Sequence, residues 1–184
     1  KYRRISPNTR VEKVVFVGRT LISKGIKDFI WLAEQFRHTN ILFEIYGDSD
    51  DNIDSINVGD IQVDKVNRNL FYHGKIDHVE DILPIASVIV LPSLREGLSL
   101  TLCEAAASGL AILTYDVAGC REVCSHGKNG YTSSVNDKTD LANNLRRLID
   151  EPDQLIRFSV ASMVLAKQFD KSIINAQLLS ILNE

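Results

Sequence analysis

One stretch near the middle of the chain constrains the fold more than any other. The run Ala86-Ser-Val-Ile-Val-Leu91 is almost entirely apolar and does not alternate, which is typical of a parallel strand buried on both faces. Pro92 cannot donate to a strand ladder, so we expect the strand to stop there. Gly97 is expected to allow a tight turn, and residues 100–108 predict a helix that ends at Gly109. The stretch therefore predicts a strand, a loop and a helix.

The rest of the chain repeats this alternation. Further strands are predicted at residues 13–17, 40–46, 70–74, 111–115 and 130–133, and helices at 26–36, 77–85, 119–125, 141–149, 153–168 and 170–182. Ser23 is the expected N-cap of the first helix, and Asp137 or Thr139 that of the helix over 141–149. Residues 48–69 have no clear period and predict a loop with at most one short helix. Strands that alternate with helices predict parallel βαβ units in a doubly wound, Rossmann-like α/β sheet.

Length and charge limit the functions that are open. The chain has 184 residues, enough for one α/β domain with a core but not for two large ones. Its net charge of −3 gives no bulk electrostatic reason to bind nucleic acid. No apolar run approaches the length of a membrane span. The chain starts at Lys1 and its single methionine is Met163, so we expect it to be part of a longer protein.

Three cysteines raise the question of disulfides and metals. Cys103, Cys120 and Cys124 are too few for a disulfide framework and fit a reducing compartment. Cys120, Cys124 and His126 have no fourth ligand nearby, and their spacing matches no zinc pattern. We therefore expect a cytoplasmic protein without a metal site.

Two glutamates flank the loop after the central strand. Glu96 follows the carboxyl end of the strand, where open α/β sheets bind ligands. Glu104 lies about one turn into the next helix, whose free N–H groups and partial positive charge suit an anion. Each glutamate also has a purely structural interpretation. Glu96 could stabilise the helix dipole, and Thr101-Leu-Cys-Glu104 has the pattern of a capping box.

Two cations follow the first predicted strand. The segment from Gly18 to Lys24 matches neither a P-loop nor a GxGxxG fingerprint. Its Arg19 can still bind two phosphate oxygens, and Lys24 can add a point charge, at the edge that carries Glu96. A solvated surface pair is the alternative.

The order and spacing of these segments resemble the retaining GT-B glycosyltransferases of family 4, also called glycosyl transferases group 1. The resemblance extends from Val14 to Leu148 and rests on Val15-Phe-Val-Gly-Arg19 with Lys24-Gly25, Ser87-Val-Ile-Val-Leu-Pro-Ser93, Glu96-Gly-Leu98, Glu104-Ala-Ala106 with Gly109, Asp116-Val-Ala-Gly-Cys-Arg-Glu122 and Gly127-Lys-Asn-Gly130. It implies the C-terminal half of a GT-B fold. Residues 1–12 would then be a lead-in from a preceding N-terminal domain, 13–150 a nucleotide-sugar-binding domain, and 151–184 a C-terminal helical extension.

The resemblance implies transfer of a sugar from a nucleoside-diphosphate sugar, in the first place a UDP sugar, to an acceptor hydroxyl with retained configuration. The acceptor, a glycan or lipid-linked glycan, would bind the preceding domain, and any association with the inner face of a membrane would come through that domain. No cofactor or metal is implied. Residues 116–122 resemble those of bacterial surface-polysaccharide transferases. The chain alone is expected to bind donor without transferring sugar.

The resemblance also implies roles for single residues. Arg19 and Lys24 would hold the donor diphosphate as it leaves, and Glu96 would bind hydroxyls of the sugar and help to stabilise positive charge at its anomeric carbon. Glu104 would accept from both ribose hydroxyls. The remaining implied donor contacts are Gly18, Gly97, Leu98, Ser99 and Leu100 near the phosphates, and Gly74, Lys75 and Ile76 near the nucleobase. Residues 74–76 are as readily an ordinary turn.

Two positions depart from the family pattern. Ser49 stands where the family usually has a glycine, which leaves the ligand role of the 48–69 loop open. Ser99 stands where many members have proline or glycine, but it keeps its amide donor and can cap the helix.

Two other classes of protein remain open. One is a nucleotide-sugar epimerase or a phosphorylase of the same GT-B plan, although epimerases lack the Glu-x7-Glu pair at this spacing. The other is a non-catalytic nucleotide-binding module, against which the joint presence of Arg19, Lys24, Glu96 and Glu104 argues.

Overall fold

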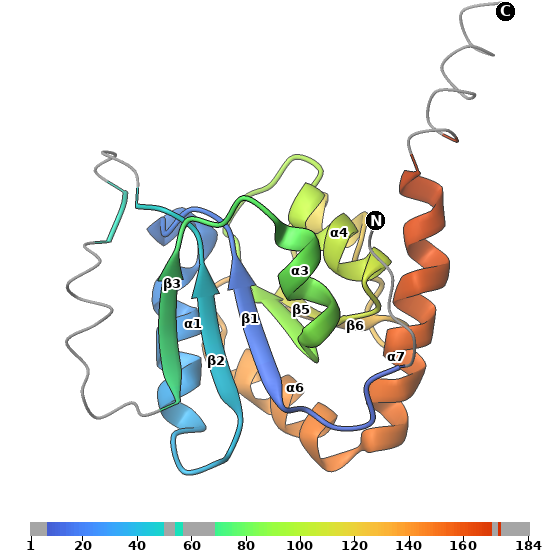
Figure 1. Ribbon diagram of the computed structural model, residues 1–184, viewed down its shortest axis with the longest axis horizontal. Coiled ribbons are helices and arrows are strands. Elements are labelled where there is room, and N and C mark those ends of the chain that lie inside the picture. Colours follow the sequence, from blue (N-terminus) through green and yellow to red (C-terminus); the bar gives the residue numbers. More distant parts are fainter. Residues whose placement is uncertain (1–6, 50–53, 57–68, 171–172, 174–184) are drawn as a thin grey trace, which may run out of the picture.

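The computed structural model describes residues 7–49, 54–56, 69–170 and 173. Its strands are β1 (Lys13–Val17), β2 (Leu42–Tyr46), β3 (Leu70–Gly74), β4 (Val88–Leu91), β5 (Ala111–Tyr115) and β6 (Gly130–Ser133). They form one sheet in the order β3-β2-β1-β4-β5-β6, and every pairing in it is parallel (Figure 1). The chain moves outward from β1 to β3, returns to the middle at β4, and moves outward again. The predicted doubly wound sheet is confirmed, with its switch point between β1 and β4.

The central strands are buried because helices cover both faces of the sheet. All residues of β4 and β5 are buried, as their apolar, non-alternating sequences predict. Four of the predicted strands have the observed bounds, whereas β2 and β4 each begin two residues later than predicted. Ser87, just before β4, still donates its N–H to Lys13 O over 2.8 Å, so the ladder extends slightly beyond the strand.

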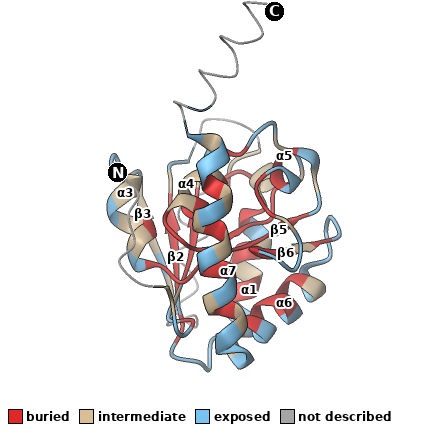
Figure 2. Ribbon diagram, turned by 90° about the vertical axis from the view of Figure 1, so that its right-hand side faces the viewer, coloured by how far each residue is buried: buried red, intermediate tan, exposed pale blue. Residues whose placement is uncertain are grey.

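The helices form a layer on each face of the sheet. Their bounds are η1 (Ile22–Lys24), α1 (Ile26–Gln35), α3 (Val79–Ile82), η2 (Leu83–Ile85), α4 (Leu100–Ala107), α5 (Ala118–Arg121), α6 (Lys138–Asp150), α7 (Pro152–Leu165) and η3 (Ala166–Phe169). α1 packs against α6 behind the sheet in Figure 1, and α4 packs against α7 on the other face. Figure 2 shows the buried strands between these partly exposed helices.

Two predicted helices are each divided between two helix types. The helix over 77–85 consists of α3 and then η2, where Pro84 lies in the first turn. The helix over 153–168 is α7, which has Pro152 in its first turn, followed by η3. The predicted helix over 170–182 and most of the 48–69 loop lie outside the described residues.

Helix α7 is attached to the connection between α4 and β5 by two buried serines. Ser159 Oγ donates to Gly109 O and Ser162 Oγ donates to Leu110 O, each over 2.7 Å. Because these carbonyls belong to the α4–β5 connection, the bonds hold α7 beside α4. The C-terminal helices therefore pack directly on the element that carries Glu104.

Candidate functional site

The loops at the carboxyl edge of the sheet touch one another through glycines. A Cβ at Gly47 would lie 1.8 Å from Gly18 O, and one at Gly25 would lie 2.0 Å from Pro92 O. Gly25 also has a φ of +79°, which disfavours any side chain. The loops after β1, β2 and β4 are therefore in backbone contact, at the edge where doubly wound sheets bind ligands.

The loop after β4 is held from its other side by the start of α5. A Cβ at Gly119 would lie 1.2 Å from Gly97 O, so no side chain fits there. The chain bends at Gly97 as predicted, but the bend does not require a glycine. Gly97 has no positive φ, and a Cβ there would meet nothing within 4 Å. Close packing makes the glycine necessary at 119 instead.

Lys24 and Glu96 meet between the loops after β1 and β4. Lys24 Nζ lies 2.7 Å from Glu96 Oε1, and the two side chains are 25% and 10% exposed. Leu94 N donates to Ser23 O over 2.9 Å, which joins the two loops. Lys24 is therefore not a solvated surface cation, whereas the Arg19 residue is exposed.

A cavity of about 690 Å³ lies beside this pair. Its lining residues are Arg19, Leu21, Ser23, Lys24, Asp54, Leu94 and Arg95. The structure thus brings Arg19 and Lys24 together, as predicted, and adds Asp54 and Arg95, which the sequence analysis missed. Arg95 directly precedes Glu96, and this adjacency was the one available signal. Asp54 lies in a stretch without periodicity, where the sequence carries no such signal.

Asp54 holds Ser23 in place by hydrogen bonds, and both residues line the cavity. Its carboxylate accepts a hydrogen bond from Ser23 N over 3.1 Å and another from Ser23 Oγ. These two bonds, with a smaller attraction from Arg95 and Lys27, lower the pKa of Asp54. The predicted N-cap role of Ser23 is wrong, because α1 begins after Gly25 without a side-chain cap. The Ser23 hydroxyl is bonded to Asp54 instead.

Helix α4 begins at the same edge. Its N-cap is Ser99, whose Oγ accepts from Leu102 N over 3.5 Å. Thr101 lies inside the helix, so the capping box of Thr101 and Glu104 is wrong. Glu104 lies in the second turn of α4 and is not needed to cap it. Leu98 and Leu100 are exposed near the start of the helix.

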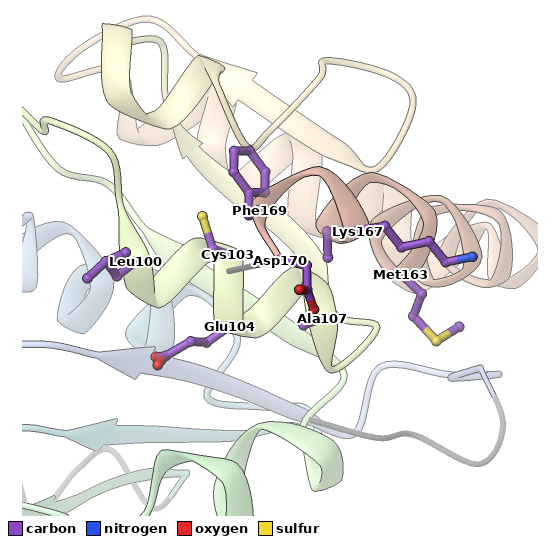
Figure 3. Close-up of a pocket in the computed structure, with 9 residues that line it drawn as sticks. Leu100, Cys103, Glu104, Ala107, Met163, Lys167, Phe169 and Asp170 are labelled. Carbon is purple, nitrogen blue, oxygen red and sulfur yellow. The ribbon is translucent and has the colours of Figure 1, made fainter. Parts of the chain in front are cut away.

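Glu104 lines a second hollow, between α4 and the end of α7 (Figure 3). Its volume is about 450 Å³, and its lining residues are Leu100, Cys103, Glu104, Ala107, Met163, Ala166, Lys167, Phe169 and Asp170. In Figure 3 the Glu104 carboxylate points away from Phe169 and Met163. The structure therefore separates Glu104 from the cavity of Arg19 and Lys24, although α4 and its preceding loop connect the two places.

The predicted nucleobase segment follows β3 at the same edge. Gly74 has a φ of +72°, and its carbonyl accepts from Gly47 N over 2.8 Å. Tyr72 Oη also donates to Gly47 O over 3.0 Å. These bonds hold the 74–76 turn beside the loop after β2, two strands away from the loop that carries Arg19 and Lys24.

Two other kinds of feature, a metal site and a membrane-spanning helix, are absent from the described residues. Among the described residues, no group of three or more His, Cys, Asp or Glu side chains is arranged to hold a metal ion. Burial raises the pKa of the Cys120 thiol to about 11. Within the same residues, no helix combines the length and apolar character needed to cross a bilayer.

Comparison with known proteins gives a family match and similar folds. The family model described as glycosyl transferases group 1 matches residues 1–162. A Campylobacter jejuni N,N'-diacetylbacillosaminyl-diphospho-undecaprenol alpha-1,3-N-acetylgalactosaminyltransferase is 27% identical, over 95% of this chain and 46% of its own length. The chain thus spans about half the length of this relative.

Solved structures have the same fold. The HepE protein from Anabaena, solved in complex with UDP, has a TM-score of 0.80 and 18% identity over 95% of this chain and 49% of its own. The C-terminal domain of a glycosyl transferase group 1 family protein from Francisella tularensis has a TM-score of 0.72 and 18% identity, over 85% of each chain.

Proposed function

Because this chain belongs to the glycosyl transferases group 1 family, we propose that it is the donor-binding domain of a retaining glycosyltransferase. The donor is a nucleoside-diphosphate sugar, in the first place a UDP sugar. The acceptor is a hydroxyl group of a glycan or lipid-linked glycan. The sugar is transferred in a cleft between this domain and a second domain, in the synthesis of a polysaccharide or glycoconjugate.

The observation that carries the proposal is the pairing of Lys24 Nζ with Glu96 Oε1, 2.7 Å apart. Lys24 lines a cavity that Arg19 also lines, and the loop that carries Glu96 leads into α4. An anion in this cavity meets the cations of Arg19 and Lys24, and a ligand that extends past Glu96 toward α4 can use the free N–H groups of the helix start. The carboxylate beside them can accept hydrogen bonds from sugar hydroxyls. A diphosphate joined to a sugar satisfies both sets of groups.

These groups suit the bond-breaking step. As the bond between the anomeric carbon and the phosphate oxygen breaks, its electron pair stays with the nucleoside diphosphate. Arg19 and Lys24 stabilise that growing negative charge. Glu96 holds the sugar hydroxyls and stabilises the positive charge left on the ring. Because the cations of the chain supply positive charge at the phosphates, the proposal requires no metal ion there.

Two relatives support the choice of substrates. The Anabaena structure contains UDP, which supports a UDP sugar as donor. The name of the Campylobacter relative describes an acceptor linked to undecaprenol diphosphate, which supports a lipid-linked glycan as acceptor. We propose that Glu104 binds the ribose and that the 74–76 turn lies near the base.

Calorimetry with UDP tests the proposal. The chain should bind UDP equally well with and without EDTA. Arg19→Ala should weaken binding by about 1.5–3 kcal/mol, the range for a charge-assisted hydrogen bond. If UDP and UDP sugars do not bind at all, the proposed function is wrong. If binding strictly requires a divalent ion, the metal-free site is wrong.

A further inference from the structure

Arg95 is a cation of the donor cavity to which the proposed function gives no role. It lies in the loop between β4 and α4 and lines the same cavity as Arg19 and Lys24. The residue is exposed, and its charge acts on the carboxylate of Asp54, another residue of the cavity wall. An anion that enters this cavity therefore comes under the influence of Arg95 as well as Arg19.

The loops that carry the two arginines are both held in place. Ser93 Oγ donates to Arg95 O over 3.0 Å and to Ser23 O over 3.2 Å. Leu21 N donates to Arg19 O over 2.8 Å, and Thr20 N donates to Asp48 O over 3.1 Å. Since the backbone of both loops is fixed before a ligand arrives, less ordering entropy is lost on binding.

The charge of a bound diphosphate calls for a further cation in the cavity, and Arg95 can supply it. A nucleoside diphosphate carries more than one negative charge at neutral pH. The charge of Lys24 is already offset by Glu96 at 2.7 Å, so Lys24 adds less to phosphate binding than a free cation would. Asp54 adds a further negative charge to the cavity wall, so Arg19 alone would leave much of the ligand charge unbalanced. A second guanidinium in the same cavity can bind phosphate oxygens in a bidentate manner.

We propose that Arg95 is a further donor-binding residue and that it binds the phosphate next to the transferred sugar. This inference rests on the proposed function, which puts the nucleoside toward Glu104 and the sugar toward Glu96. Arg95 directly precedes Glu96 and lines the cavity of Lys24, whereas Glu104 lines the other hollow. The distal phosphate is therefore the part of the diphosphate within reach of Arg95.

The test uses calorimetry on the whole chain, with UDP and UMP as probes. Arg95→Ala should weaken UDP binding by about tenfold or more, but it should change UMP binding by less than about twofold, because UMP lacks the distal phosphate. Arg95→Lys should give an intermediate loss for UDP, since it keeps the charge but not the planar fork. Melting temperatures should match the parent, because the Arg95 side chain is on the surface.

Arg37→Ala is the matched control. Arg37 is an exposed arginine just after α1, at the opposite end of that helix from the cavity, and its partner is Glu34. The variant loses the same unit of charge and should bind both probes like the parent. If Arg95→Ala binds UDP as the parent does, or loses UMP and UDP equally, this inference is overturned while the proposed function stands. If the parent binds no UDP, the proposed function fails and this inference fails with it.

Discussion

Single residues determine how the proposed site can hold both a phosphate and a sugar. The Glu96 side chain is only 10% exposed and depends on Lys24 for a compensating charge. A ligand that draws Lys24 toward its phosphate must offer Glu96 something in return. A sugar hydroxyl can do so, because it donates a hydrogen bond to the carboxylate. This exchange favours an intact nucleotide sugar over a free diphosphate.

The two glutamates should affect binding differently. Glu104→Ala should weaken UDP itself by about 1.5–3 kcal/mol, because it removes a charged acceptor from the ribose. Glu96→Ala should not weaken the binding of UDP, because it leaves Lys24 available to the phosphates, but it should weaken the binding of the UDP sugar. Calorimetry with UDP and UDP-glucose on both variants measures the difference.

Thermal unfolding provides the control for this prediction. Because Ser99 is the N-cap of α4, Glu104→Ala should leave the helix cap intact, and its main effect should be on UDP affinity and not on the melting temperature. A variant that binds UDP normally but unfolds early would contradict the ribose assignment.

The thermal stability of the protein should depend on pH through the ionisation of Asp54. Its folded pKa lies below the ordinary value of 3.8, so its contribution is fully present above that pH and is lost as the pH falls through the folded value. Asp54→Ala should therefore melt below the parent at pH 7, and the gap should close with acidification. Scanning calorimetry across this range measures it.

Ser23→Ala is the matching variant. It removes the hydroxyl bond to Asp54 and keeps the bond from Ser23 N. Its loss at pH 7 should be smaller than that of Asp54→Ala. If the difference in melting temperature between the parent and Asp54→Ala does not change with pH, the stabilising role assigned to the Asp54 carboxylate is contradicted.

Among the elements, the loop between β4 and α4 depends most on its neighbours. The loop after β1 contacts it through Gly25 and Pro92, and the start of α5 contacts it through Gly119 and Gly97. It carries Arg95 and Glu96 and leads into α4. The position of the proposed site therefore depends on packing between loops as well as on the sheet.

A pair of glycine variants tests this dependence. Gly119→Ala should reduce the free energy of unfolding by about 1–3 kcal/mol, because its Cβ would overlap Gly97 O. Gly97→Ala should cost much less, since its Cβ would meet open space and its φ is not positive. Urea unfolding of both variants measures the difference. Equal losses would show that contact between these loops does not control stability.

At the scale of the whole molecule, this domain supplies one wall of the proposed cleft. The chain spans 46% of the length of the Campylobacter relative. In the proposed reaction, closure of two domains excludes water and brings the acceptor to the donor. A single wall can bind the donor, but it cannot position the acceptor hydroxyl.

The chain alone should therefore bind UDP sugars without transferring sugar. The measurement is incorporation of labelled sugar from UDP-glucose or UDP-N-acetylglucosamine into a bacterial lipid fraction, which should stay at background. UDP binding in the same preparation is the control for folding. Robust transfer by residues 1–184 would contradict the two-domain reaction.

The sequence by itself determined the sheet and the edge on which the proposed site lies. The run from Ala86 to Leu91 predicts a buried strand because its pattern is local, and Pro92 marks where the ladder must end. The predicted loop positions of Arg19, Lys24 and Glu96 follow from the same local pattern. Parallel strands bring their carboxyl ends together, so no distance was needed to predict that these residues share an edge.

Only the tertiary structure decided which loops touch and which side chains pair. The bond from Ser23 to Asp54 joins residues 31 positions apart, and the contact of Gly119 with Gly97 joins two separate loops. Arg95, in the loop after β4, lines the same cavity as Arg19, in the loop after β1. These contacts depend on how loops pack above a finished sheet. The periodicity of the sequence does not predict that packing, because the packing arises between segments that are distant in sequence.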